Sequence, residues 1–234
     1  MKNFVIWNGK DSREIKGLVI CELPPIVKPP MRYAETMIDG VDGAIIEELG
    51  YDPYDKALVI GLTPKADINE VVEYFAGQGE VVFSDEPNHF YKASILNQID
   101  YTRLVRYKTA VVTFRVQPFK YEYEEEKTIV SAENTVKTVL VVNEGNCFAK
   151  PVIEIRGNGT IELIVNDEKM FSYTFTDGED SVIIDSEKQD AYFGSVLKNR
   201  NMSGEYPNLE VGINTITWEG NVISLSISSK SRWL

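Results

Sequence analysis

The chain has little of the chemistry from which metal sites and active sites are built. Its 234 residues include one histidine, His89, and two cysteines, Cys21 and Cys147. Because no Cys-x-x-Cys pair accompanies that single histidine, a zinc site is excluded. The two thiols lie in strand-like segments, and we expect both to be buried as small hydrophobic side chains without a disulfide. No metal or cofactor is therefore expected.

Long hydrophobic runs and phosphate-binding loops are also missing. No apolar run approaches the roughly 18 residues of a membrane span. The first residues hold only a short apolar stretch at positions 4–7, which is not typical of a secretory signal. The glycines at 77 and 79 follow a predicted helix, so they lack the helix N-terminus that makes such a loop bind phosphate. We expect synthesis and folding in a cytoplasm without membrane insertion.

Acidic side chains outnumber basic ones, 36 to 24, which gives a net charge of −12. Residues 1–121 carry 14 basic and 17 acidic groups and residues 122–234 carry 10 and 19, so the balances are −3 and −9. Such a chain repels nucleic acid and anionic membranes, and stable DNA binding is not expected. One stretch is locally basic, and we interpret it as a solvated or subunit-facing edge: Arg103, Arg106, Lys108, Arg115 and Lys120.

Turn residues and apolar runs predict a β-rich first half. Strands are expected at residues 4–7 and 15–23, joined through Asn8-Gly9, a pair that supplies the positive φ of a tight turn. Prolines at 24, 25, 29 and 30 stop regular pairing and predict an extended loop. The other elements expected here are a glycine-rich turn at 39–43, strands at 58–62 and 80–83, a turn at 84–87, and two long strands ending at 117–119.

One helix is predicted between these strands, at residues 68–77. Asp67 can cap it, with Glu70 three residues further on as in a capping box. Gly77 suits the left-handed position that follows a helix. An apolar stripe, which we expect to cover a sheet, recurs at helical spacing: Ile68, Val71, Val72 and Phe75.

The second of the two long strands alternates strictly between two kinds of side chain. We expect its apolar face in the core: Ala110, Val112, Phe114 and Val116. The opposite face, with Val111, Thr113 and Arg115, is amphipathic enough for a surface between subunits. Together with the basic residues that precede the strand, it predicts a subunit interface made of Arg103, Arg106, Lys108, Thr113 and Arg115.

The second half is expected to be all β. Short β-rich runs occur at 139–142, 152–155, 161–165, 171–175, 182–184, 213–218 and 222–227. Turn pairs separate them at 158–159, 166–167, 177–178 and 220–221, and such spacing predicts an antiparallel sandwich. The glutamates at 122 and 124–126 indicate a solvated linker rather than a metal site, because a strand-like run alternates its carboxylates between two faces. We therefore predict domains at residues 1–125 and 126–234.

Two groups of residues could suggest catalysis, and neither is favoured. His89 lies close in sequence to Ser84 and Asp85, but residues on one tight turn cannot easily reach the geometry of a triad. A glycosidase needs two carboxyl groups facing each other across a cleft. The acids that could suggest one lie near Tyr192 and are Asp185, Glu187 and Asp190. Because most acids here alternate with apolar residues or occupy turns, as on solvated faces, we expect no enzymatic activity.

Several motifs are too long and too unusual to arise from generic strand chemistry. Within residues 79–121 they are Phe-Ser-Asp-Glu-Pro at 83–87, Tyr-Lys-Ala at 91–93, Arg-Leu-x-Arg-Tyr-Lys-Thr-Ala at 103–110 and Gln-Pro-Phe-Lys-Tyr at 117–121. Together they closely resemble the N-terminal domain of the distal tail proteins of siphophages and related prophages. The second half is similar to the same family at residues 143–146, 150–151, 157–160, 184–186, 202–207, 212–214 and 231–234.

The resemblance implies a structural virion protein of a long non-contractile tail, made in the cytoplasm of the bacterial host. In this family six copies form a ring at the distal end of the tail. The implied fold is mainly β: an α+β N-terminal domain, with one helix on a β-sheet, builds the ring, and a C-terminal galectin-like antiparallel β-sandwich projects outward. The implied partners are the tail tube protein, the tail-associated fibre or lysin protein and, in many phages, receptor-binding proteins. DNA would pass through the bore without being bound.

Carbohydrate binding by the second half is an alternative function, which would contribute to adsorption to the host cell wall. The galectin-like form that the resemblance implies can stack a sugar on an exposed aromatic ring. The stacking candidates are Tyr192, Tyr206 and Trp218, with Trp233 also available. A packed position is the commoner use of a tryptophan in an alternating strand, so both interpretations of Trp218 stay open. The short intervals between these strands leave no room for the inserted carbohydrate-binding modules of longer relatives.

Overall fold

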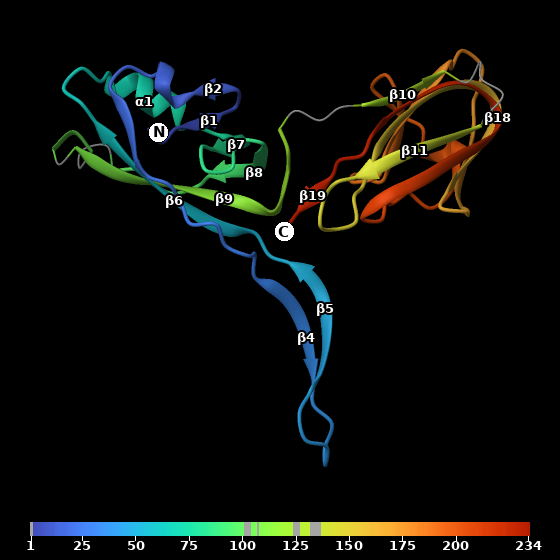
Figure 1. Ribbon diagram of the computed structural model, residues 1–234, viewed down its shortest axis with the longest axis horizontal. Coiled ribbons are helices and arrows are strands. Elements are labelled where there is room, and N and C mark those ends of the chain that lie inside the picture. The colour runs from blue at the N-terminus through green and yellow to red at the C-terminus, as the bar shows by residue number, and fades with distance from the viewer. Residues whose placement is uncertain (1, 101–103, 107, 124–126, 132–136) are drawn as a thin grey trace. The chain divides into compact units, whose positions relative to one another are not determined.

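The computed structural model describes residues 2–100, 104–106, 108–123, 127–131 and 137–234, and it divides into two compact units at residues 123 and 124 (Figure 1). Each unit has its own cluster of buried hydrophobic side chains. Strands dominate both units, and their neighbours are antiparallel, so the predicted mainly β fold is confirmed.

The first unit combines an antiparallel sheet, a separate two-stranded hairpin and a helix. Its elements are β1 (Val5–Trp7), β2 (Lys10–Asp11), the 3₁₀ turn η1 (Ser12–Glu14), β3 (Leu18–Glu22), β4 (Met31–Thr36), β5 (Ile45–Tyr51), β6 (Tyr54–Leu62), α1 (Ile68–Tyr74), β7 (Gln78–Phe83), β8 (His89–Ile95) and β9 (Thr109–Glu122). The sheet runs in the order β2-β1-β7-β8-β9-β6-β3, and β4 and β5 form a small sheet of their own. A short helical turn also occurs at residues 104–106.

The first tight turn lies where the sequence predicts it, but the strand after it differs. Asn8 and Gly9 have φ angles of 51° and 78°, as the turn requires. The strand that pairs back onto β1 is β2, whereas residues 18–22 form β3 and pair with β6 at the far side of the sheet. The prediction of one hairpin from 4–7 and 15–23 was therefore wrong, because η1 turns the chain away after β2.

Helix α1 begins at its predicted cap. The Asp67 carboxylate accepts a hydrogen bond of 2.9 Å from the Asn69 amide, as an N-cap does. The buried face includes Val71 and Tyr74, while Val72 is 39% exposed, so Val72 was wrongly assigned to the stripe. The Tyr74 hydroxyl lies 3.0 and 3.1 Å from two backbone carbonyl oxygens of the β1–β2 region, which share its proton and hold the helix against the sheet. The helix ends at Tyr74, and Gly77 has the expected positive φ of 81° two residues after the cap.

Strand β9 forms the centre of the first core with the side chains that alternation predicts. Phe114 is fully buried, and the rings of Trp7, Phe83 and Phe75 meet it edge-on with centroids 5.3, 5.7 and 6.4 Å away. The strand continues past Pro118, although the sequence suggests weakening there. Its pairing with β8 is irregular at this point, and a bulge lets a proline without a donor sit inside a strand.

The second unit is an all-β arrangement around its own core. Its elements are β10 (Thr128–Ser131), β11 (Thr138–Asn143), β12 (Val152–Val165), β13 (Glu168–Thr174), β14 (Ser181–Asp185), β15 (Asp190–Phe193), β16 (Val196–Leu197), the 3₁₀ turn η2 (Asn199–Asn201), β17 (Met202–Gly204), β18 (Gly212–Ser228) and β19 (Arg232–Trp233). The strands run in the order β10-β18-β12-β14-β15-β16, with β11 beside β18 and β13 between β12 and β17.

Two predicted turns are bends within the longest strands of this unit. The pairs at 158–159 and 220–221 lie inside β12 and β18, which run alongside each other. The register shifts between Asn158 and Glu162, so the ladder is interrupted without ending. Gly220 has a φ of 87°, and a Cβ there would approach a backbone oxygen of the facing strand to 2.3 Å. The glycine signals were correct, but a bend between two halves of a strand uses them as readily as a hairpin does.

Candidate functional site

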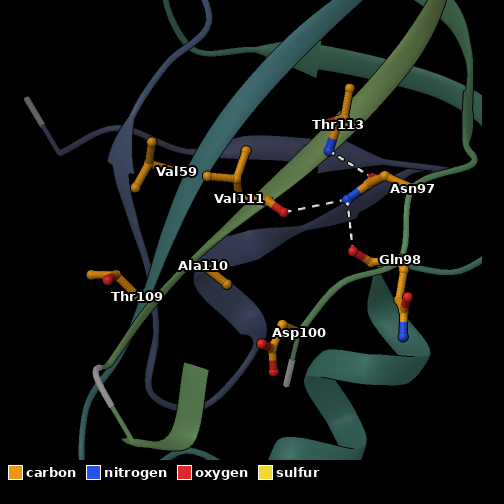
Figure 2. Close-up of a pocket in the computed structure, with 8 residues that line it drawn as sticks. All are labelled: Val59, Asn97, Gln98, Asp100, Thr109, Ala110, Val111 and Thr113. Atoms are coloured by element: carbon orange, nitrogen blue, oxygen red, sulfur yellow. Dashed lines mark hydrogen bonds between the residues drawn. The ribbon is translucent and has the colours of Figure 1, made fainter. Parts of the chain in front are cut away.

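The outer face of the first sheet carries a shallow hollow of about 300 Å³ where β8 leaves β9 (Figure 2). Asn97, just beyond β8, lies over the exposed edge of β9. Its side-chain oxygen accepts from the Thr113 amide at 2.9 Å, and its amide nitrogen donates to the Val111 carbonyl at 3.4 Å. The side chain thus takes the place of a paired strand and satisfies backbone groups that would otherwise remain unpaired.

Apolar and polar groups both line this hollow. Val59 and Val111 contribute methyl groups to the lining, and Asp100, Gln98 and Thr113 contribute polar atoms (Figure 2). Val111 is 48% exposed although it stands in the middle of a sheet. A half-buried valine pair with a polar rim is the chemistry of a small protein–protein contact.

Cys21 also lies on this outer face, which corrects the expectation that both thiols are buried. The β3–β6 register shifts next to it, and the bulge turns its side chain outward. Gly61 makes room for it, since a Cβ on Gly61 would stand 2.8 Å from the Cys21 sulfur. Cys147 is half-buried, and the two thiols form no disulfide with each other.

The predicted interface residues are only partly brought together. Thr113 lines the hollow, and Arg115 lies two residues further along the same face, where its guanidinium pairs with Asp55 at 3.2 Å. Arg106 and Lys108 are exposed in the segment that leads into β9. Arg103 lies outside the described residues, so its place in the interface stays a prediction.

The hairpin β4–β5 is a second candidate surface, which the sequence did not reveal. Ile45 and Ile46 are adjacent on β5, so their side chains point to opposite faces, yet each is 60% exposed. Neither face of this hairpin therefore packs against a hydrophobic core. The other large hydrophobic side chains exposed on it are Met31, Tyr33, Met37, Ile38, Val41 and Leu49. A signal was present in two apolar stretches on either side of the glycine turn at 39–43, where Gly40 and Gly43 have positive φ.

Three motif segments of the first half meet in one buried polar cluster. Glu86 comes from the turn after β7, Tyr91 from β8 and Lys120 from β9. The Tyr91 hydroxyl donates to the Glu86 carboxylate at 2.8 Å, and the Lys120 ammonium pairs with the other carboxylate oxygen. The side chains of Glu86 and Lys120 are 9% and 15% exposed, so the pair is largely shielded from water.

Lys56 on β6 adds a second buried cation beside this cluster. It is 2% exposed, and its ammonium lies 4.9 Å from the Tyr91 ring centroid and 5.5 Å from that of Phe83. Burial lowers the pKa of Lys56 below its usual value, although the charges of Glu86 and Asp85 oppose this. Burial alone would raise the pKa of Glu86, but the hydrogen bonds from Lys120 and Tyr91 outweigh it and hold that pKa below the ordinary value.

Asparagines from the sequence motifs of the second unit form hydrogen bonds with the backbone of its loops. Asn143 is 1% exposed; its amide nitrogen donates to the carbonyls of Cys147 and Leu209 at 2.9 and 3.2 Å, and its oxygen accepts from the Gly145 amide at 3.0 Å. Gly145 touches the backbone of Arg232, where a Cβ would lie 2.2 Å from the carbonyl oxygen. The distant motifs at 143–146 and 231–234 are thus two sides of one joint.

Asn214, from the motif at 212–214, closes a second loop in the same manner. Its side chain is fully buried and contacts the Glu210 backbone twice, accepting from the amide at 2.9 Å and donating to the carbonyl at 2.8 Å. Asn166 donates to the same side-chain oxygen at 2.9 Å. Asn143 and Asn214 therefore have structural roles, because their side chains satisfy backbone groups of the loops beside them.

The aromatic candidates for sugar stacking are separated by the structure. Trp218 is 2% exposed in the second core, so it cannot stack on a ligand, and that candidate was wrong. Tyr206 is half-buried against the same core. Tyr192 is half-buried on an outer sheet face, at a hollow of about 250 Å³ that also contains Glu154 and Ser226. Residue type alone does not show whether an aromatic side chain on a strand faces the core, as Trp218 does, or the outer face, as Tyr192 does.

Two of the residues considered for catalysis, Ser84 and Asp185, make hydrogen bonds that hold the fold. The Ser84 hydroxyl accepts from the Phe4 amide at 3.1 Å, and burial lowers the pKa of His89, as does the nearby Lys120. Asp185 pairs with Lys188 at 2.8 Å and accepts from two backbone amides of its own turn. Among the described residues no group of three or more histidines, cysteines or acids could hold a metal ion. No helix in the described part of the chain is long and apolar enough to cross a membrane.

Comparison with known proteins gives a match in fold. No protein-family model matches the chain, and no curated protein matches it in sequence. Among solved structures it is similar to one described as "Crystal Structure of SPP1 Dit (gp 19.1) Protein, a Paradigm of Hub Adsorption Apparatus in Gram-positive Infecting Phages". The TM-score is 0.72 at 13% sequence identity, and the match covers 100% of both chains. The two proteins therefore share a fold over their full length.

Proposed function

We propose that the protein is a structural component of a phage tail: a homohexameric hub at the distal end that joins the tail tube to the fibre or lysin protein. The observation that carries the proposal is the full-length fold match to a phage hub protein. The motif resemblance points to the same class independently of the fold. In this role the protein works by binding its neighbours, without catalytic turnover, and receptor-binding proteins are further partners.

The first unit offers surfaces suited to ring formation. A two-stranded hairpin is marginally stable alone in water, and β4–β5 exposes large apolar side chains on both faces. Such a surface gains burial when it packs against another copy of the chain. The hollow of Figure 2 offers a recess lined by both apolar and polar side chains. We assign ring building to residues 1–125 and the outward-projecting, galectin-like part to residues 126–234.

Electron microscopy and native mass measurement test the proposal on the full chain, alone and after co-expression with its tail tube protein. We expect rings of six copies. A strict monomer under both conditions, at high protein concentration, contradicts the hub function. Arg106→Glu tests the basic edge of the interface: we expect weaker assembly, and assembly equal to wild type would remove Arg106 from the interface.

Carbohydrate binding is a second candidate, and the hollow at Tyr192 favours it. A tyrosine ring beside the Glu154 carboxylate and the Ser226 hydroxyl offers both a stacking surface and hydrogen-bond partners for a sugar. The test is a pull-down of the full chain with host cell walls, in parallel with Tyr192→Ala. Binding lost in the variant supports the site, and no binding of the wild-type chain to host cell walls removes this function.

A further inference from the structure

We propose that Lys56 is a latch that fixes the direction in which the hairpin β4–β5 leaves the first sheet. Its ammonium donates a hydrogen bond of 2.9 Å to the carbonyl of Pro25, in the segment that leads into the hairpin. Lys56 itself stands in β6, just after the hairpin returns. One side chain therefore connects the two legs of the hairpin.

The incoming leg lacks backbone pairing to the sheet. It is held by side-chain contacts, since Leu23 packs against the core, Pro24 is buried and the Lys28 ammonium lies 5.7 Å from the Tyr51 ring centroid. Residues 23–30 lie outside the strands, and the four prolines in this segment lack the amide hydrogens with which a strand pairs. Their carbonyl oxygens can still accept. The Asp52 amide donates to Pro30 at 2.9 Å, which joins the two legs to each other, and Lys56 joins the incoming leg to the sheet through Pro25.

The returning leg is held in a different way. It continues into β6, which pairs with β9 along its length. The Tyr51 ring, at the end of β5, meets Phe119 of β9 edge-on with centroids 6.0 Å apart. This leg is bound to the sheet by backbone pairing, whereas the Lys56 hydrogen bond ties the backbone of the incoming leg to the same strand.

The surroundings of Lys56 favour a directional role over a stabilising one. Burying an ammonium is costly, and an apolar side chain of similar volume is often tolerated equally well or better. Here ring faces and the neighbouring Glu86 carboxylate offset that cost. What a methionine in the same space could not do is donate to the Pro25 carbonyl.

Lys56→Met separates the two roles. We expect the melting temperature of the first unit to be unchanged or raised, since the apolar side chain fills the same volume. The Asp52 amide should exchange with solvent about ten- to a hundred-fold faster, because a hydrogen bond to a charged group is lost at the hairpin base. Hydrogen exchange by NMR on the full chain measures this. Wild-type protection of Asp52 in a folded Lys56→Met protein overturns the proposal.

Spin labels measure the direction itself. We place them at Glu47→Cys on β5 and Glu73→Cys on α1, in a background of Cys21→Ser and Cys147→Ser. The distance distribution between the labels should be narrow when Lys56 is present and broad in the Lys56→Met variant. Lys92→Met is the matched control, because Lys92 on β8 also lies over a tyrosine ring, with its ammonium 4.6 Å from the ring centroid of Tyr121 on β9. The control should keep the narrow distribution; equal broadening in both variants overturns the latch.

Lys56→Gln covers the case in which the methionine variant does not fold. A glutamine is neutral and its amide nitrogen stands one bond short of the lysine ammonium, so its hydrogen bond to the Pro25 carbonyl is lengthened or lost. Protection of Asp52 should therefore fall below wild type in a folded Lys56→Gln protein. Wild-type protection there would overturn the proposal.

The consequence for assembly rests on the proposed ring. Lys56→Met should assemble at least about tenfold less tightly than Lys92→Met, because a hairpin without a fixed direction loses more entropy on docking. A loosened hairpin with wild-type assembly would overturn this link. If the wild-type chain forms no ring, the hub function fails, whereas the Asp52 and spin-label measurements on the monomer still decide the latch.

Discussion

Large apolar side chains occur both on the hairpin β4–β5 of the first unit and on the long strands β12 and β18 of the second. The two regions differ in how far these side chains are buried. In β12 and β18 half-buried or exposed side chains alternate with buried ones, so each strand has a core on one face. In β4 and β5, whose residues are all described, no side chain is buried. A strand without a core of its own needs a partner to supply one, and this contrast favours the first unit as the assembly surface.

The largest expected effect is on assembly. Ile45→Asp with Ile46→Asp places a charge on each face of the hairpin and should weaken ring formation by about 100-fold or more, since two large apolar contacts are lost. Thermal unfolding should change little. Analytical ultracentrifugation measures the association.

The matched control carries the same change on the second unit. Leu140→Asp with Ile213→Asp alters side chains that are 60% and 70% exposed over a complete core. We expect rings equal to those of the wild type. Rings lost in this variant and kept in the hairpin variant would reverse the comparison between the two units.

The next effect tests whether the two cores are independent. Phe114→Ala should destabilise the first unit by about 3–5 kcal/mol, and Phe171→Ala should do the same to the second unit, because each removes a buried ring from its own core. Differential scanning calorimetry should show one transition moving in each variant. If both transitions shift together in either variant, the units unfold as one.

A smaller effect concerns acid stability in the second unit. The Glu179 carboxylate pairs with Lys198, accepts from the Thr176 amide at 3.0 Å, and is held at a pKa of about 2, although burial alone would raise it. A carboxyl whose pKa is lowered by folding stabilises the fold above its unfolded pKa, and that contribution is lost as the pH falls from about 4.5 towards 2. Glu179→Gln should cost about 2 kcal/mol at neutral pH.

Denaturant titrations from neutral pH down through this acid window measure the contribution. Wild type and Glu179→Gln should converge in stability as the pH falls, because the charge that separates them is titrated away. An equal gap at every pH would show that Glu179 acts through its shape and neutral hydrogen bonds instead.

The smallest expected effect tests whether Arg115, on the outer face of the first sheet, contacts a neighbouring copy. Arg115→Ala breaks an exposed pair with Asp55, which should change the free energy of unfolding by less than about 0.5 kcal/mol. Any larger loss in ring assembly would therefore report a contact with a neighbour. Unchanged assembly would remove Arg115 from the interface and leave the hairpin as the main surface.

Local features of the fold could be predicted well. The alternation of Val112, Phe114 and Val116, the cap at Asp67 and the turn at Asn8-Gly9 depend on residues close in sequence, and all three are confirmed. The prediction of separate turns at 158–159 and 220–221 was wrong, because a glycine with positive φ occurs in a bend inside a strand as well as in a hairpin. Only the pairing with the facing strand distinguishes the two.

The candidate site could be predicted only in part. The face that carries Thr113 and Arg115 followed from strand periodicity, whereas the bare hairpin did not, because its apolar residues look like those of any buried strand. Trp218 was a stacking candidate but is buried in the core. The sequence could not decide this, because an exposed stacking ring and a core ring occur in the same sequence pattern.

The sequence by itself determined the mainly β class, the local turns and caps, and the motifs that resemble those of distal tail proteins. These depend on backbone preferences and on the order of short segments. Only the tertiary structure decided that Glu86, Tyr91 and Lys120 meet in one buried cluster, that Lys56 reaches the Pro25 carbonyl, and that the hairpin lacks a core. Burial and charge pairing depend on residues that are distant in the sequence. The local alternation of apolar and polar residues gives no information on which distant residues these are.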